Sequence, residues 1–132
     1  MAYEDIFRTL RVNNFLEIQS NASFPVQTFT ATGTLKAGVA TGLITLDHIS
    51  TPIVLTDLPA PKDSGQLLII SNISASGTEA HTVTCESGVT FDGTNNTATL
   101  DAPAEQLILM SISTTRWLIL LNSGSVGLSS VA

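Results

Sequence analysis

The chain has 132 residues, about the length of one domain, and 43% of them are apolar while only 12% are charged. This aliphatic content with a modest net charge of −6 excludes a disordered chain, and the five basic residues form no cluster of the kind that a nucleic-acid partner requires. No apolar run approaches the roughly 18–20 residues of a membrane span, and the acidic start of the chain does not fit a secretory signal. We therefore expect no nucleic-acid partner, no membrane and synthesis in a cytoplasm.

Residues 1–24 are predicted to form an N-terminal arm. The candidate interface residues of this arm are Tyr3, Ile6, Phe7, Leu10 and Phe15. The first four have the i, i+3, i+4, i+7 spacing of one helical face, and a helix this short needs a surface to dock on. Three interpretations are open: a helix packed on its own domain, an arm that docks on a neighbouring subunit, or an extended strand over residues 11–18.

Residues 25–121 are predicted to form an all-β domain, either a jelly-roll-like β-sandwich or a small barrel. The polarity of the chain comes mainly from 18 Thr and 14 Ser, and β-branched Thr favours sheet over helix. Alternating or apolar runs recur about every 8–12 residues with turn residues between them, which is typical of a sandwich or barrel. The candidate strands cover residues 26–31, 43–46, 53–56, 66–73, 80–85, 88–91, 97–100, 106–112 and 116–121.

Two of these runs, residues 67–70 and 117–121, are apolar at every position. An unbroken apolar run predicts a strand that is covered on both faces, either inside the domain or by a neighbouring molecule. Asp92-Gly93 predicts a two-residue hairpin, because both residues tolerate a positive φ.

Residues 122–132 contain four Ser, two Gly and no charge, and they are predicted to form a flexible C-terminal tail. Val126, Leu128 and Val131 alternate with small residues, so the tail has the pattern for adding a strand to another sheet edge.

Side chains that carry chemistry are few. His48 follows Asp47 in a short loop, and neighbouring residues of this kind are no evidence for a catalytic dyad. His81 opens an alternating strand on which Val83 and Cys85 share a face, so Cys85 is interpreted as a small buried hydrophobe. The acidic residues are scattered instead of paired for acid–base work. We therefore expect no catalytic residue, no cofactor and no enzyme.

Asp92-Gly93-Thr94-Asn95-Asn96 has the oxygen atoms that a calcium loop uses. It lacks a second Asp and the terminal bidentate Glu, so a turn is predicted and no metal is expected. Arg116 and Trp117 stand at the entrance of the last apolar strand and join the candidate interface, because Trp and Arg are enriched at binding hot spots. A tryptophan at this position is also compatible with the core.

Part of the chain resembles a β-module of structural proteins of tailed bacteriophages. The resemblance is carried by Leu58-Pro59-Ala60 and by Ser64-Gly65-Gln66-Leu67-Leu68-Ile69-Ile70-Ser71-Asn72. It continues through His81-Thr82-Val83-Thr84, Val89-Thr90-Phe91-Asp92-Gly93, Thr97-Ala98-Thr99-Leu100 and Arg116-Trp117-Leu118-Ile119-Leu120, and covers about half of the chain.

Such modules occur in head-decoration, or cement, proteins and in tail-fibre or receptor-binding proteins. The short length and the N-terminal arm favour decoration. The resemblance then implies a homotrimer of jelly-roll-like domains on the outer surface of the capsid, which bridges major capsid protein subunits in the virion. The alternative is a tail-fibre or baseplate module that binds a receptor or glycan through surface aromatics in a shallow groove. A cupin-like metalloprotein is the weakest alternative, because it needs more His ligands than His48 and His81.

Overall fold

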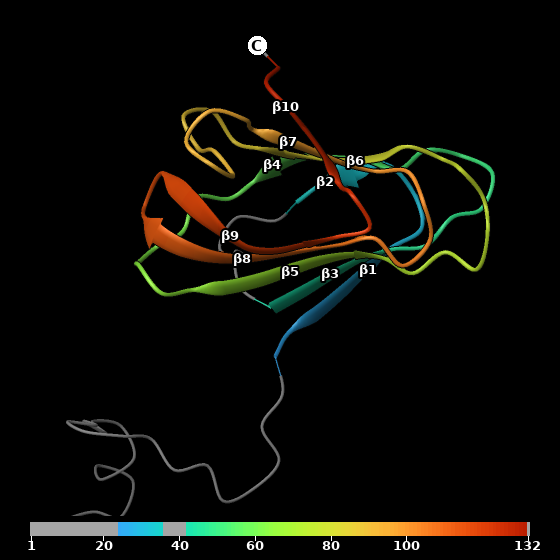
Figure 1. The fold of residues 1–132 in the computed structure, drawn as a ribbon, viewed down its shortest axis with the longest axis horizontal. Coiled ribbons are helices and arrows are strands. Elements are labelled where there is room, and N and C mark those ends of the chain that lie inside the picture. The colour runs from blue at the N-terminus through green and yellow to red at the C-terminus, as the bar shows by residue number, and fades with distance from the viewer. Residues whose placement is uncertain (1–23, 36–41, 132) are drawn as a thin grey trace, which may run out of the picture.

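The computed structural model describes residues 24–35 and 42–131, which form an all-β sandwich of two mixed five-stranded sheets (Figure 1). The predicted all-β class is confirmed, and of its two alternatives the sandwich is the one found, because each sheet has two open edges. The described residues contain no helix, and hence none long enough to cross a membrane. The predicted arm lies outside the described residues except for Phe24, its last residue.

The first six strands alternate between the two sheets, so that each pair of strands is one turn of a coil (Figure 1). Successive turns stack in parallel. In the first sheet, called sheet A, the parallel strands are β1 (Val26–Phe29), β3 (Gly42–Leu46) and β5 (Leu67–Asn72). In sheet B they are β2 (Gly33–Thr34), β4 (Val54–Leu58) and β6 (His81–Cys85).

Antiparallel strands complete each sheet. They are β7 (Thr97–Leu100) and β10 (Gly127–Ser129) in sheet B, and β8 (Gln106–Ser113) and β9 (Arg116–Ser123) in sheet A. The strand order is β1-β3-β5-β8-β9 in sheet A and β10-β7-β6-β4-β2 in sheet B. A jelly roll is antiparallel throughout. The parallel coil is therefore a strand order that the sequence pattern did not predict.

The core lies between the sheets and is built from the inward side chains of alternating strands. Leu68, Ile70, Leu107 and Leu109 are fully buried on the inner face of sheet A, and Trp117 joins them from β9. Sheet B contributes a matching set that includes Leu55, Val83 and Leu100, and the loop residue Phe91 fills the space between the layers. The cost of truncating such side chains, about 2–5 kcal/mol each, makes this layer the main source of stability.

The start of β1 comes so close to β3 that only glycine fits at residue 42. Leu43 donates its backbone N–H to the carbonyl oxygen of Pro25 at 2.9 Å. A Cβ on Gly42 would lie 2.2 Å from the same oxygen, and Gly42 has a φ of 110°. The absence of a side chain at this position therefore lets the first turn of the coil dock on the second.

The predicted hairpin at Asp92-Gly93 is wrong. Residues 88–91 form no strand apart from one bridge between Thr90 and Arg116, and β7 pairs with β6 instead. Asp92 closes a local turn, in which its Oδ1 accepts the backbone N–H groups of Thr94 and Asn95 at 2.8 and 2.7 Å. The dipeptide therefore marks a turn within a longer loop, because side-chain hydrogen bonds replace those of a strand ladder.

The C-terminal residues up to Val131 belong to the sandwich, which corrects the prediction of a flexible tail over residues 122–132. β10 pairs antiparallel with β7, and Val126 is buried. Asn96 holds Val131 on both sides, because its Nδ2 donates to the Val131 carbonyl oxygen and its Oδ1 accepts the Val131 N–H, each at 2.9 Å. The alternation noted in this segment is thus used for strand addition within its own domain.

Candidate functional site

The outer face of sheet A carries aliphatic side chains from one edge strand to the other, beside one polar row formed by Thr28, Thr45, Ser71, Gln106 and Ser123. The outward side chains are those that alternate with the buried core residues of the same strands. They form a surface that we call the aliphatic face, which consists of Val26, Leu43, Leu67, Ile69, Ile108, Met110, Ile112, Leu118, Leu120 and Leu121. Among the described residues no strand lies on this face (Figure 1).

Strand register aligns these side chains in rows across the sheet. Ile69 of β5 lies between Leu43 of β3 and Ile108 of β8, and Ile108 in turn pairs with Leu121 of β9. A shorter row joins Leu67, Met110 and Leu118. At the edge strand β9, Leu118 and Leu121 end these rows and Leu120 lies at the register shift between Ile119 and Leu121; the three side chains are exposed to 44%, 49% and 49% in the order Leu118, Leu120, Leu121. Contiguous exposed aliphatic side chains of this extent are unusual on a monomeric protein and mark an interaction surface.

Charge is nearly absent from this sheet. The five strands of sheet A contain one charged residue, Arg116, at the start of β9. The acidic residues of the described segments lie in loops or in sheet B; they are Asp47, Asp57, Asp63, Glu79, Glu86, Asp92, Asp101 and Glu105. The aliphatic face therefore lacks the charged side chains that the loops and sheet B carry.

The outer face of sheet B has a different chemistry, because threonines occupy most of its outward positions. Across the sheet these are Thr34, Thr56, Thr82, Thr84, Thr97 and Thr99. The hydroxyl oxygens of Thr84 and Thr97 are 3.0 Å apart, and those of Thr34 and Thr56 are 3.4 Å apart. Four of these six hydroxyls are thus paired between neighbouring strands. A face of this kind is easily solvated, so the two sides of the sandwich are chemically distinct.

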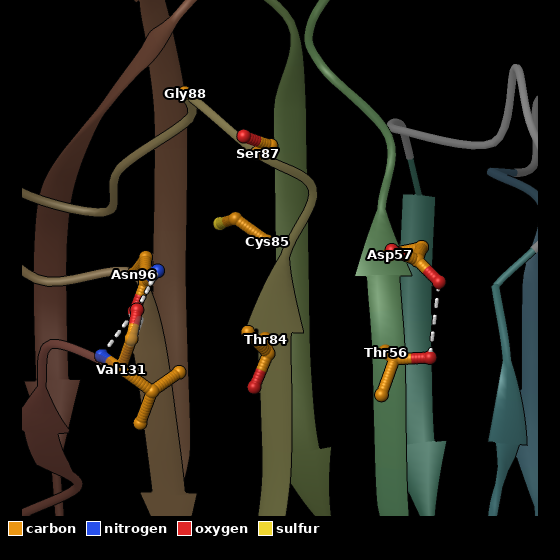
Figure 2. Close-up of a pocket in the computed structure, with 8 residues that line it drawn as sticks. All are labelled: Thr56, Asp57, Thr84, Cys85, Ser87, Gly88, Asn96 and Val131. Atoms are coloured by element: carbon orange, nitrogen blue, oxygen red, sulfur yellow. Dashed lines mark hydrogen bonds between the residues drawn. The ribbon is translucent and has the colours of Figure 1, made fainter.

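A cavity of about 570 Å³ opens over the end of sheet B (Figure 2). Its lining residues are Thr56, Asp57, Thr84, Cys85, Ser87, Gly88, Asn96 and Val131. They offer hydroxyl groups, one carboxylate and no basic side chain, so the cavity suits a neutral polar or cationic group better than an anion. None of the lining residues is aromatic, which removes the stacking surface expected of a glycan groove.

Asp57 reaches this cavity through a β-bulge. The register of β4 against β6 shifts between Leu55 and Leu58, and Asp57 has a φ of 58°. Bulges of this kind redirect a side chain, and aspartate tolerates the left-handed region better than most residues do. The hydroxyl of Thr56 donates to Oδ2 of Asp57 at 3.1 Å (Figure 2).

The structure brings together Ser74, His48 and His81, a contact that the sequence spacing did not reveal. Ile53 donates its N–H to Nδ1 of His81 at 2.9 Å, so the imidazole proton is assigned to Nε2, which lies 3.3 Å from Oγ of Ser74. Oγ of Ser74 donates to the His48 carbonyl at 3.1 Å and accepts the His48 N–H at 3.0 Å. The hydroxyl proton thus points away from the imidazole, which is opposite to a nucleophile–base pair. This cluster ties two loops together.

The single cysteine is a buried core residue, as predicted. Cys85 is 5% exposed, and burial raises the pKa of its thiol from 9.0 to about 12, with Glu86 adding to the increase. A thiol with this pKa stays protonated at neutral pH and is a poor nucleophile.

Of the predicted interface residues, the structure describes only Arg116 and Trp117. Trp117 is fully buried, so its side chain is part of the core and is not exposed to a partner. Arg116 is exposed, and its Nη2 donates to the Asp92 carbonyl oxygen at 3.0 Å, which fastens the 92–95 turn to β9. Tyr3, Ile6, Phe7, Leu10 and Phe15 lie outside the described residues.

The aliphatic face itself was missed as a site. Its signal was present in the runs 67–70 and 117–121, whose apolar side chains were expected to be covered on both faces. Within the described chain Leu68, Ile70 and Trp117 are buried, Leu67 and Ile69 are half-buried, and the leucines of the second run are exposed. Both alternatives for these runs, cover inside the domain and cover by a neighbouring molecule, stay predictions.

In residues 24–35 and 42–131, no group of three or more His, Cys, Asp or Glu side chains has the arrangement of a metal site. The predicted turn at residues 92–96 is confirmed by its Asx hydrogen bonds. Burial opposes the ionisation of Asp92, but hydrogen bonds from Asn95 and Thr94 and the charge of Arg116 outweigh it, so the pKa of Asp92 is lowered.

Comparison of the chain with known protein families and with curated protein sequences gave no match.

Proposed function

We propose that this chain is a virion structural protein that decorates the outer surface of a tailed-bacteriophage capsid. It acts as a homotrimer and bridges subunits of the major capsid protein. The proposal is supported by the resemblance described above, whose motifs fall on β5, β6, β7 and β9 and on the turns that lead into them. Its work is done by contact and needs no reaction centre.

The single observation that carries the proposal is the contrast between the two outer faces of the sandwich. An aliphatic, nearly charge-free face on one side and a threonine-lined face on the other fit a protein that is built into an assembly through one surface and meets solvent with the other. Burial of aliphatic area supplies non-directional binding energy in proportion to the area removed from water, which suits a structural clamp.

The test is binding to capsids assembled without this protein. The purified full-length chain, titrated onto such capsids and recovered by sedimentation, is expected to bind to saturation at a fixed ratio to the major capsid protein. Removal of residues 1–20 is expected to weaken this binding and to leave the far-ultraviolet circular dichroism of the sandwich unchanged. A full-length protein that stays in the supernatant at every concentration would contradict the proposal.

The second candidate function is a receptor- or glycan-binding module of a tail fibre or baseplate. The cavity over sheet B is the observation in its favour, because its hydroxyl and carboxylate groups suit the hydroxyls of a sugar even without an aromatic stacking surface. Binding on a glycan array, lost on Asp57→Asn, together with presence in the tail fraction of disrupted virions, would support this candidate. An empty array with the protein found only in the head fraction would remove it.

A further inference from the structure

The aliphatic face is large enough for a stable protein–protein contact. Five strands about 4.8 Å apart, each about six residues long at about 3.3 Å per residue, cover roughly 24 Å by 20 Å, or about 500 Å² in projection. The accessible area of a face with projecting side chains exceeds its projection, and stable interfaces bury about 800 Å² on each partner. The outer face of sheet A, of which the aliphatic face is the larger part, is therefore of the order that one whole interface requires.

Charge restricts which partner fits. The full chain carries a net charge of −6, so two copies repel each other in most orientations. The exception is the approach of two aliphatic faces, because the strands of sheet A contain no acidic residue. A charged partner would find no complementary group on this face beyond Arg116.

The exposed edge of sheet A also indicates that a partner covers this side of the molecule. β9 is an edge strand of eight residues, and its exposed side chains include Leu118, Leu120 and Leu121. Long apolar edge strands promote uncontrolled pairing unless they are covered. Two register shifts against β8 twist this edge but leave its leucines outward. The partner that covers the face therefore also has to cover the edge, and it has to be present as soon as the chain folds.

We propose that further copies of this chain cover the aliphatic face, so that the outer faces of sheet A from different subunits pack against one another. This deepens the proposed function, on which its biological role rests, by naming the surface through which the subunits assemble. Sheet B, with its threonines and its cavity, stays on the outside of the assembly.

The test uses two engineered thiols of equal exposure in the isolated subunit. Leu118 on the aliphatic face is 44% exposed, and Val54 on the outer face of sheet B is 40% exposed. Cys85 is buried with a thiol pKa of about 12, so it is not expected to react with maleimide at neutral pH. In the full-length protein, Leu118→Cys is expected to react more than about tenfold slower than Val54→Cys, because its thiol is reached only through the dissociated state.

Mass measured by light scattering separates the possible outcomes. A multiple of the subunit mass together with protection of Leu118→Cys supports the proposal. A monomer, or an oligomer in which both thiols react equally fast, overturns it. Protection in a monomer also overturns it, since the chain's own residues would then cover the face.

A second pair of variants tests the same contact without relying on the cysteine variants. Met110→Lys places a charge in the centre of the aliphatic face, and Val54→Lys places the same charge on the other side of the sandwich. Met110→Lys is expected to give a folded monomer and Val54→Lys the wild-type mass, with circular dichroism as the check on folding. An oligomer that persists in folded Met110→Lys, or in Leu118→Lys if the former does not fold, would overturn the proposal.

The capsid-binding experiment and the experiments on the aliphatic face can give opposite results, so the two proposals are tested separately. An oligomer held by the aliphatic face that ignores capsids would contradict the decoration role and leave the assembly surface standing. A monomer that binds capsids to saturation would do the reverse.

Discussion

At the scale of single residues, His81 has the environment with the clearest consequence for stability. It is 1% exposed, and its Nδ1 accepts the N–H of Ile53, a bond that requires this nitrogen to be unprotonated. Burial lowers the pKa of His81 from the ordinary 6.5, although the His48 carbonyl and Glu79 act in the opposite direction. The neutral imidazole is therefore part of the native structure.

We expect the free energy of unfolding to fall as the pH drops below 6.5. In that range the unfolded state binds a proton at His81 that the native state, with its lower pKa, does not bind. The stabilisation is fully present above pH 6.5 and is lost as the pH falls through the native pKa. Urea unfolding followed by circular dichroism at a series of pH values measures the effect.

His81→Asn is the informative variant, because its side-chain oxygen is placed to accept the Ile53 N–H and does not titrate. This component of the pH dependence should disappear in His81→Asn and persist in the control, His48→Asn. An unchanged slope in His81→Asn would assign the effect to another group.

At the scale of the strand, Gly42 controls whether the first turn of the coil docks. Gly42→Ala is expected to destabilise the protein by about 2–4 kcal/mol, because the methyl group meets the Pro25 carbonyl at 2.2 Å and the φ of 110° is unfavourable for alanine. Gly33→Ala in β2 is the matched control, since nothing lies within 4 Å of its added Cβ. Chemical unfolding of the two variants measures the difference. Equal stability would mean that β1 does not depend on this approach.

The strands were predictable from the sequence to a far greater extent than their partners. Alternation and apolar runs are local signals, and they placed β5, β6, β7, β8 and β9 close to their observed bounds. Pairing is not local in a parallel coil. Val26 lies beside Leu43, and Leu43 beside Ile69, with a strand of the other sheet intervening each time. No turn residue indicates that two such non-consecutive strands are neighbours. The coil, and the sheet to which each run belongs, therefore could not be predicted from the sequence.

The same limit applies to the candidate site. The run 117–121 predicted a covered strand. Which of its side chains face outward depends on a register shift near Leu109, and no residue type in the sequence predicts that shift. The cavity over sheet B depends on the bulge at Asp57, and Ser74 meets His81 only because two loops fold over the same end of the sandwich. Composition predicted a contact protein, and only the tertiary structure reveals the aliphatic face as the candidate contact surface.

At the scale of the whole molecule, the proposed apolar contact between copies and the like charge on every copy have opposite effects on association, and together they predict the effect of salt. Repulsion between copies reaches about 30 Å at about 0.01 M salt and about 10 Å at about 0.1 M. The aliphatic face contains no ion pair for salt to weaken. Self-association is therefore expected to tighten as sodium chloride is raised, which sedimentation equilibrium measures.

Leu118→Lys is the control for this prediction and should stay monomeric at both ionic strengths. A dissociation constant of the wild-type protein that increases with salt would indicate a contact held by opposite charges, and hence a surface other than the aliphatic face.

Trp117, the only tryptophan of the chain, gives this architecture a built-in optical reporter. Its indole is fully buried on the inner side of β9, and its Nε1 has no hydrogen-bond partner among the described residues. Its emission should therefore lie at short wavelength in the native protein and shift to the red only when the sandwich opens. Leu118, the next residue on the same strand, faces the opposite way, so subunits can separate without wetting the indole. Intrinsic fluorescence should thus distinguish loss of the fold from loss of the proposed assembly in a single unlabelled sample.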